Sequence, residues 1–180
     1  MDIIFYLILG FFGLVVTIFL LTVFFGAPYV PSHKADLVKL FTKLKLNRKD
    51  ILVDIGSGDG VVLKIASQFG AQTIGFEINP FLVTISKFRL RKAKNSQVFL
   101  RNFWHVLPLE QVSHLYTFGH AERISKMLAL AQLQANSQQS PLTFISYGFE
   151  IPNLNYSRKI GAHFIYKIQP KTSQKHKNML

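Results

Sequence analysis

The chain has 180 residues, contains no cysteine, and carries 21 Lys and Arg against 9 Asp and Glu, which gives a net charge of +12. The lack of cysteine excludes disulfide bonds, thiolate metal sites and cysteine nucleophiles. So large a basic excess indicates an anionic partner. Because an apolar segment opens the chain, we expect that partner to be the membrane lipid bilayer and not nucleic acid. The sequence does not indicate an oligomeric state.

The first segment, Ile3–Phe25, is 23 consecutive residues without a charge. As an α-helix of ~1.5 Å per residue it would span about 35 Å, more than the roughly 30 Å of a hydrocarbon core. A cleaved signal peptide is disfavoured because no basic residue precedes the run, the run is too long, and no small-x-small site ends it. We therefore predict a transmembrane anchor over residues 1–26.

Charges on either side of this segment predict its orientation. Only Asp2 precedes it, whereas four lysines follow it closely: Lys34, Lys39, Lys43 and Lys45. Positive residues favour the cytoplasmic side of a membrane. We therefore expect a single-pass membrane protein whose domain is cytoplasmic, or on the matrix side if the membrane is that of an organelle.

Residues 27–48 are expected to form a linker and an amphipathic helix ahead of the domain. Gly26–Pro31 is a stiff connector, with Tyr29 and Val30 between two prolines. Its plain interpretation is a linker whose tyrosine lies at the membrane interface. In the helix that follows, apolar residues recur on one face: Leu37, Leu40, Phe41 and Leu44. That face suits a helix that packs between the bilayer and the domain.

The domain itself, expected over residues 49–170, begins with a buried strand and a glycine turn. Ile51–Ile55 is almost entirely apolar, as in a parallel strand covered on both faces. Three glycines follow at alternate positions: Gly56, Gly58 and Gly60. Apolar residues then recur at helical spacing: Val62, Ile65, Ala66 and Phe69. Strand, turn and helix form the first half of a βαβ unit, whose ligand binds over the carboxyl end of the strand.

Two acids indicate which ligand fits this turn. Asp54 lies two residues before the first glycine, where its carboxylate would repel a pyrophosphate. A dinucleotide fingerprint would also need Gly or Ala at position 61, where Val61 stands. Glu77 closes a second apolar stretch, at a strand tip where an acid can accept hydrogen bonds from ribose hydroxyls. Because of this place at a strand tip, Glu77 is expected to contribute little to the stability of the fold. A cationic ligand with a ribose, S-adenosylmethionine (SAM), is therefore favoured over NAD.

Asn79 and Pro80 are expected as the N-cap and first residue of a helix that runs to about Lys94. The exposed side of this helix would be basic: Lys87, Arg89, Arg91, Lys92 and Lys94. Such a cluster is usually a solvated face, and contact with an anionic surface is the alternative.

Two segments together resemble a known family. Val53–Gly60, read as Val-Asp-Ile-Gly-Ser-Gly-Asp-Gly, and Gly75–Pro80, read as Gly-Phe-Glu-Ile-Asn-Pro, look like motif I and the following acidic motif of class I SAM-dependent methyltransferases. With the apolar segment and Pro28–Pro31 ahead of them, they resemble the small membrane-anchored protein-lysine methyltransferases. Eukaryotic members of that family modify the ATP synthase c subunit and the adenine nucleotide translocase. The resemblance extends to about Trp104 and is weaker beyond it.

The resemblance implies a cofactor-binding site for SAM. Its members in this chain would be Asp54, Gly56, Ser57, Gly58, Asp59, Gly60, Glu77, Ile78, Asn79, Asn102 and Phe103. Asn102 stands where class I enzymes often carry an acid, although its amide can still accept from an adenine amino group. The resemblance also implies that Tyr29, Val30 and Pro31 fold over the cofactor as a lid, and this stays open beside the linker interpretation. No catalytic residue and no metal site are predicted.

The remaining elements follow in order. Gln97–Arg101 and His114–Phe118 are predicted as the third and fourth strands, Leu142–Tyr147 as the fifth, and His163–Ile168 as an edge strand. A helix is expected from Gly119–Glu122 to about Ala135; its His120 and Glu122 are either substrate contacts or solvated first-turn residues. Residues 171–180 are expected to be a basic, disordered tail.

We therefore expect an α/β fold, a Rossmann-like three-layer sandwich of the class I methyltransferase type, C-terminally reduced, with one N-terminal transmembrane helix. The resemblance, and not the residues, supplies the strand order and an antiparallel final strand. The expected function is methyl transfer from SAM to a lysine side chain of a membrane-associated protein. Two alternatives stay open: a non-catalytic SAM- or nucleotide-binding membrane adaptor, and a methyltransferase that acts on a small molecule or lipid.

Overall fold

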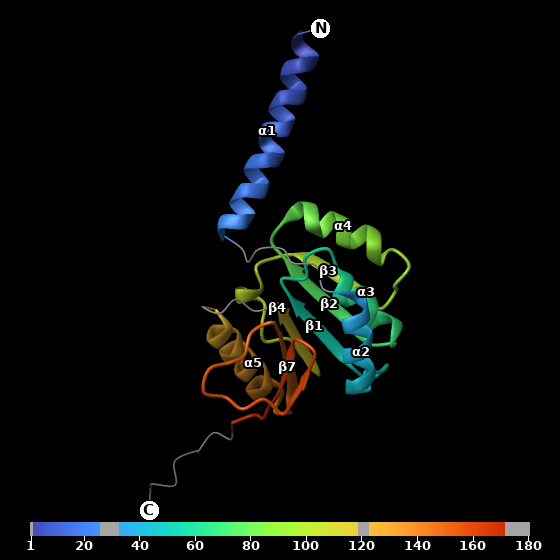
Figure 1. The fold of residues 1–180 in the computed structure, drawn as a ribbon, viewed down its shortest axis with the longest axis vertical. Helices are drawn as coiled ribbons and strands as arrows, with labels where there is room; N and C mark the ends of the chain where they lie inside the picture. Colours follow the sequence, from blue (N-terminus) through green and yellow to red (C-terminus); the bar gives the residue numbers. More distant parts are fainter. Residues whose placement is uncertain (1, 26–32, 119–122, 172–180) are drawn as a thin grey trace, which may run out of the picture.

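The computed structural model describes residues 2–25, 33–118 and 123–171, and of residues 2, 18 and 21–25 it describes the backbone alone. It consists of one long N-terminal helix, α1 (Asp2–Phe25), and an α/β domain. Figure 1 shows α1 extending away from the domain, which is built around a single twisted sheet.

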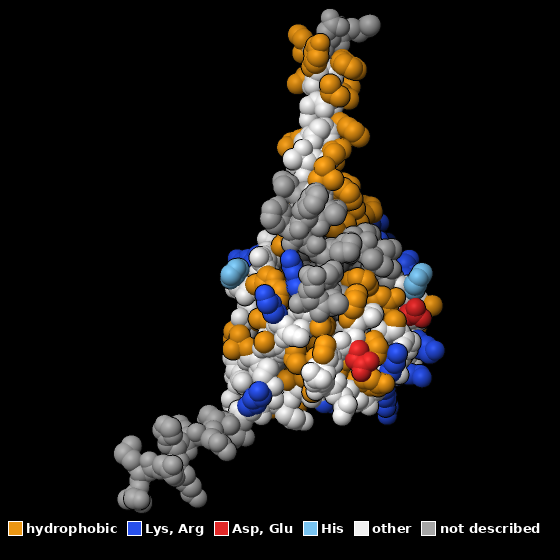
Figure 2. Space-filling model, turned by 60° about the vertical axis from the view of Figure 1, so that its left-hand side comes forward, with side chains coloured by type: hydrophobic (Ala, Val, Ile, Leu, Met, Phe, Trp, Pro, Cys, Tyr) orange, Lys and Arg blue, Asp and Glu red, His pale blue; other side chains and the backbone are white. Residues whose placement is uncertain are grey.

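Helix α1 exposes apolar side chains along its described length, as Figure 2 shows. Among the residues whose side chains are described, no helix is both long and apolar enough to cross a membrane. The transmembrane helix predicted over Ile3–Phe25 is therefore not confirmed and stays a prediction, and so does the division of the chain into an anchor, a linker and a domain.

The sheet has seven strands in the order β3-β2-β1-β4-β5-β7-β6. Strands β1 (Ile51–Ile55), β2 (Gln72–Glu77), β3 (Ser96–Leu100), β4 (His114–Phe118) and β5 (Leu142–Tyr147) are parallel. Strand β7 (His163–Ile168) is antiparallel to both β5 and β6 (Arg158–Ile160). The expected Rossmann-like α/β fold is thus confirmed, with a mixed sheet.

Helices cover the sheet in two layers. Helix α2 (Lys34–Leu44) packs on α3 (Val61–Gln68), which also contacts α4 (Pro80–Leu90). Helix α5 (Ile124–Gln138) contacts β5 and β7, and the short 3₁₀ helix η1 (Phe103–His105) follows β3. In Figure 1, α5 lies on the opposite side of the sheet from α2 and α3.

Two hydrophobic cores correspond to these two layers. The first joins α2, α3 and α4 to the sheet through residues such as Leu40, Leu63 and Tyr116. The second joins α5 to the other face through Val53, Phe144 and others. Alternate residues of one strand serve opposite cores, as the pleat requires for a strand covered on both faces.

Three sequence predictions about the elements are wrong. Strand β7 is internal and β6 is the edge; β6 was missed because it has only three residues, two of them cationic. Helix α4 ends at Leu90 and not near Lys94, because the chain turns there, with Ala93 N–H donating to Leu90 O over 2.7 Å. Helix α5 runs three residues beyond Ala135, to Gln138.

The C-terminal part keeps both antiparallel strands, so the sheet is not shortened at that end. The connection between β5 and β6, residues 148–157, contains turns and no helix.

Candidate functional site

The predicted cofactor residues meet at the carboxyl ends of three neighbouring parallel strands. Asp54 is the penultimate residue of β1, Glu77 ends β2, and Asn102 follows β3. The strand register pairs Glu77 with Leu100, and Arg101 N–H donates to Glu77 O over 3.0 Å. The parallel sheet therefore brings together acids that are far apart in the sequence, at the edge where ligands of such sheets bind.

The glycine turn is held against the end of β2. The N–H groups of Gly56 and Ser57 both donate to Phe76 O, over 2.9 and 3.0 Å. All three glycines of the turn have positive φ angles, +74° at Gly56, +53° at Gly58 and +76° at Gly60. At Gly60 space is limited as well, because a Cβ would lie 2.2 Å from Ser86 Oγ of α4. The turn thus requires glycine both for its backbone and for close packing.

Glu77 is more firmly bound into the fold than its place at a strand tip predicts. Its carboxylate is buried and accepts three backbone hydrogen bonds: Oε2 from Gly58 N–H over 2.9 Å, and Oε1 from Ile78 and Asn79 N–H over 2.8 Å each. A carboxylate has about four acceptor positions. About one position, on Oε2, is left for a ligand hydroxyl. The three backbone hydrogen bonds indicate a stabilising role for Glu77, contrary to the expectation from its place at a strand tip.

Asp54 carries the strongest electrostatic perturbation of the site. Its side chain is buried, and burial raises its pKa well above the usual value, with further contributions from the nearby Glu77 and Asp59 carboxylates. Three acids of like charge thus gather around the turn. A positive charge brought close to Asp54 would favour its ionised form and so lower this raised pKa.

Both carboxylate oxygens of Asp59 have partners within the chain. Its Oδ1 accepts from Val61 N–H over 3.2 Å, and its Oδ2 forms an ion pair with Arg89 of α4. Arg89 was predicted to lie on an exposed basic face, whereas it is half-buried in this pair. Ser86 and Arg89 are the contacts of the turn that sequence reasoning missed. No local pattern marks them, because both depend on the packing of α4 against α3.

The other predicted residues hold the backbone of the site. The Asn79 side chain caps α4 by accepting from Phe81 and Leu82 N–H over 2.9 and 3.3 Å, as predicted. The Asn102 side chain accepts from Trp104 N–H over 3.1 Å and caps η1. Phe103 lies 4.6 Å from the Trp104 ring, partly buried against the second core.

Some predictions lie outside the described residues. These are the lid formed by Tyr29, Val30 and Pro31, the substrate contacts weighed for His120 and Glu122, and the disordered tail, of which only residue 171 is described. Within the described part of the chain, no three His, Asp or Glu side chains gather as a metal site would require.

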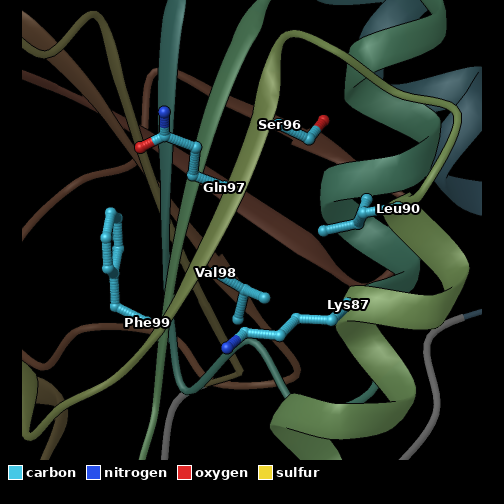
Figure 3. A pocket seen from close by; sticks show the side chains of 6 residues that line it. All are labelled: Lys87, Leu90, Ser96, Gln97, Val98 and Phe99. Carbon is cyan, nitrogen blue, oxygen red and sulfur yellow. The ribbon is translucent and has the colours of Figure 1, made fainter.

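One cavity of about 280 Å³ lies between α4 and β3 (Figure 3). It is lined by Lys87, Leu90, Ser96, Gln97, Val98 and Phe99. None of these residues belongs to the predicted cofactor set, so this cavity is separate from the glycine turn.

The chemistry of the turn fits SAM and does not fit a dinucleotide. A pyrophosphate would add negative charge beside Asp54, Asp59 and Glu77, and like charges repel strongly in a partly dry site. A ligand with an ammonium and a sulfonium group would instead neutralise the acids. A ribose hydroxyl could donate to the acceptor position left on Glu77.

Several solved structures with a similar fold are methyltransferases. An RNA methyltransferase from Salinibacter ruber, crystallised with S-adenosyl-L-homocysteine, has a TM-score of 0.67 at 19% identity and covers 82% of this chain and 98% of its own. A tRNA (m1A58) methyltransferase from Aquifex aeolicus has a TM-score of 0.54 at 17% identity, covering 68% of this chain and 49% of its own. At such identities the likeness concerns the fold, which is that of the class I methyltransferases.

The similar sequences are more specific. The chain is 30% identical over 129 residues to the ATP synthase C subunit lysine N-methyltransferase of Xenopus laevis, over 70% of this chain and 55% of the relative. It is 32% identical over 95 residues to the human protein of the same name, over 51% of this chain and 40% of the relative. The chain thus spans about half the length of the curated relatives it matches. No protein-family model matches it.

Proposed function

We propose that this protein is a SAM-dependent methyltransferase that modifies a lysine side chain of a membrane-associated protein. One observation carries the proposal. Asp54 and Glu77 lie at the carboxyl ends of adjacent parallel strands, beside a three-glycine turn, and the Glu77 carboxylate accepts a hydrogen bond from an N–H group of that turn. This arrangement accepts a ribose and favours a cation, and SAM combines the two.

In this proposal each part of the site has a distinct role. Glu77 accepts a ribose hydroxyl at Oε2, and Asp54 faces the positively charged amino-acid end of the cofactor. The Gly56–Gly60 turn lets the backbone approach the ligand closely. Asn102 and Phe103, at the end of β3, would contact the adenine.

When bound, SAM supplies an electrophilic methyl group on its sulfonium. The remaining work of the chain is to hold and align the acceptor, which contributes to the rate through proximity and orientation. A lysine must also lose its proton to act as a nucleophile, and a dry pocket favours that loss by lowering the pKa of the lysine. No residue of this chain is assigned as an acid or base.

The substrate class is supported by the names of the relatives, which are lysine N-methyltransferases of the ATP synthase C subunit. We propose a membrane location from the uncharged run Ile3–Phe25, whose side chains are exposed where they are described, Phe11 for example by 70%. The lysines after this run favour a domain on the cytoplasmic side, or on the matrix side in an organelle.

A labelling experiment tests the proposal. Purified full-length protein is incubated with radiolabelled SAM and, in parallel, with membranes of its source organism and with the isolated c subunit of an ATP synthase. We expect micromolar SAM binding, no NAD binding, and label in a protein band whose hydrolysate contains methyl-lysine. Asp54→Asn should abolish labelling, whereas Glu110→Ala, which removes an exposed acid away from the turn, should not.

Other outcomes point to the alternatives. SAM binding without transfer to any fraction would favour the non-catalytic adaptor. Label found in the lipid or small-molecule fraction, and not in protein, would contradict the lysine substrate. Binding of NAD in place of SAM would contradict the assignment of the site itself.

A further inference from the structure

Helix α4 carries two exposed phenylalanines on the face that points away from the sheet. Its inner face packs on the domain through Val83, Ser86 and Leu90. Because a helix turns by about 100° per residue, Phe81 and Phe88, which are seven residues apart, point in nearly the same direction, at the centre of the opposite face. Both rings are exposed, by 65% and 68%. A surface helix normally has a polar outer face, so two phenylalanines on one outward stripe indicate that something covers it.

The surroundings of this stripe are uniformly basic. Residues 78–109 contain six Lys and Arg and no Asp or Glu. Four of these cations are exposed at α4 and just after it: Lys87, Arg91, Lys92 and Lys94. The guanidinium of Arg91 lies 4.1 Å from the centre of the Phe88 ring, so charge and aromatic surface are directly adjacent.

An anionic lipid surface complements both properties. Aromatic rings enter the boundary between headgroups and acyl chains, while Lys and Arg contact the phosphates. Arg89 takes no part, because it is paired with Asp59.

The position of α4 in the molecule permits this contact. Helix α1 is joined to α2 by eight residues, 26–33, which span at most about 30 Å. Helix α2 packs on α3, and α3 contacts α4. In Figure 1, α4 lies on the side of the domain from which α1 extends. A bilayer reached by α1 would therefore lie close to α4.

We propose that the outer face of α4, formed by Phe81, Thr84, Phe88 and Arg91 with the neighbouring Lys92, docks on the surface of an anionic phospholipid bilayer. The contact orients the domain on the membrane, so that the cofactor site faces membrane-associated substrates. Both proposals share the membrane location of α1, but only the orienting role also rests on the proposed methyl transfer.

The absence of cysteine allows a direct test with single labels on the full-length chain. Thr84→Cys places a fluorescent label on the proposed surface and leaves both phenylalanines intact. Ser125→Cys, an exposed hydroxyl residue of α5 on the other side of the sheet, is the matched control. Each protein is mixed with nanodiscs of phosphatidylcholine alone or with added phosphatidylglycerol, and the access of an aqueous quencher to the label is measured.

We expect protection of the label at position 84, but not at position 125, in discs that contain phosphatidylglycerol. Arg91→Gln and Lys92→Gln should each weaken the contact about fivefold, and Phe81→Ser with Phe88→Ser should remove it. Equal quencher access at the two positions would overturn the proposal. So would protection of position 84 by a soluble RNA in the absence of discs, since the surface would then bind nucleic acid.

Methyl transfer measured on the same preparations separates the two proposals. Transfer to protein without protection at position 84 contradicts the lipid contact alone. Protection without SAM binding contradicts the proposed function alone.

Discussion

Replacing Glu77 tests whether this carboxylate holds the glycine turn together. In Glu77→Ala the buried Gly58 N–H loses its acceptor, which costs roughly 1–3 kcal/mol. The N–H groups of Ile78 and Asn79 lose theirs too, but Ile78 is 37% exposed, so water can replace part of that loss. Removal of the charge also relieves Asp54, which offsets some of the cost. We expect a net loss of about 1–2 kcal/mol, or a melting temperature lower by about 2–8 °C.

Glu77→Gln separates the two functions of the side chain. An amide has one oxygen, so it can accept from Gly58 N–H or from the N–H groups of Ile78 and Asn79, but not from both sides. Its NH₂ group then faces the remaining N–H donors, and two donors cannot form a hydrogen bond. We therefore expect Gln to destabilise the fold about as much as Ala. A lost charge-assisted bond to a ribose hydroxyl should weaken SAM binding about tenfold or more in both variants.

Thermal unfolding and calorimetric titration with SAM check both effects, and Glu110→Ala serves as the control for loss of one carboxylate. Melting temperatures equal to that of the unchanged protein would refute the structural role of the three N–H contacts. Unchanged SAM affinity in a folded variant would remove Glu77 from the cofactor site.

Three further predictions concern the same turn and its support. Burial and the carboxylates of Glu77 and Asp59 raise the pKa of Asp54. The protonated Asp54 side chain therefore contributes its full share of stability below the unfolded pKa of about 3.9, and this share is lost as the pH rises toward the raised value. In Asp54→Asn the melting temperature should fall less between roughly pH 4 and 8 than in the unchanged protein, and SAM binding should be weaker. Gly60→Ala should be more destabilising than Gly56→Ala. Both positions have a positive φ, but a Cβ at Gly60 would clash with Ser86, whereas nothing lies within 4 Å of a Cβ at Gly56. Equal melting temperatures would show that Ser86 moves aside at no cost. Asn79→Ala should cost about 0.5–2 kcal/mol through loss of the α4 cap, and denaturant unfolding would contradict the cap if the midpoint did not move.

Local chemistry was enough to predict much of the fold. The parallel strands are largely apolar runs bounded by turn residues. The bounds predicted for β1, β3, β4 and β5 lie within one residue of the observed ends, and the predicted end of β2 at Glu77 is the observed one. The cap at Asn79 and the first helical position at Pro80 depend only on a few neighbouring residues. The same holds for the glycine turn, whose positive φ angles are open to glycine and costly for other residues.

Pairing between distant segments was decided by the tertiary structure. Glu77 meets Gly58 only because β2 lies beside β1, and Asp59 meets Arg89 only because α4 packs against α3. Strand β7 is internal because the three-residue β6 pairs with its free side. The alternation of apolar and polar residues indicates which side chains are buried, but it does not indicate which strand or helix they pack against. The outward phenylalanines of α4 illustrate the same limit. No local pattern shows that Phe81 and Phe88 face outward; the packing of Val83 and Leu90 on the domain shows it.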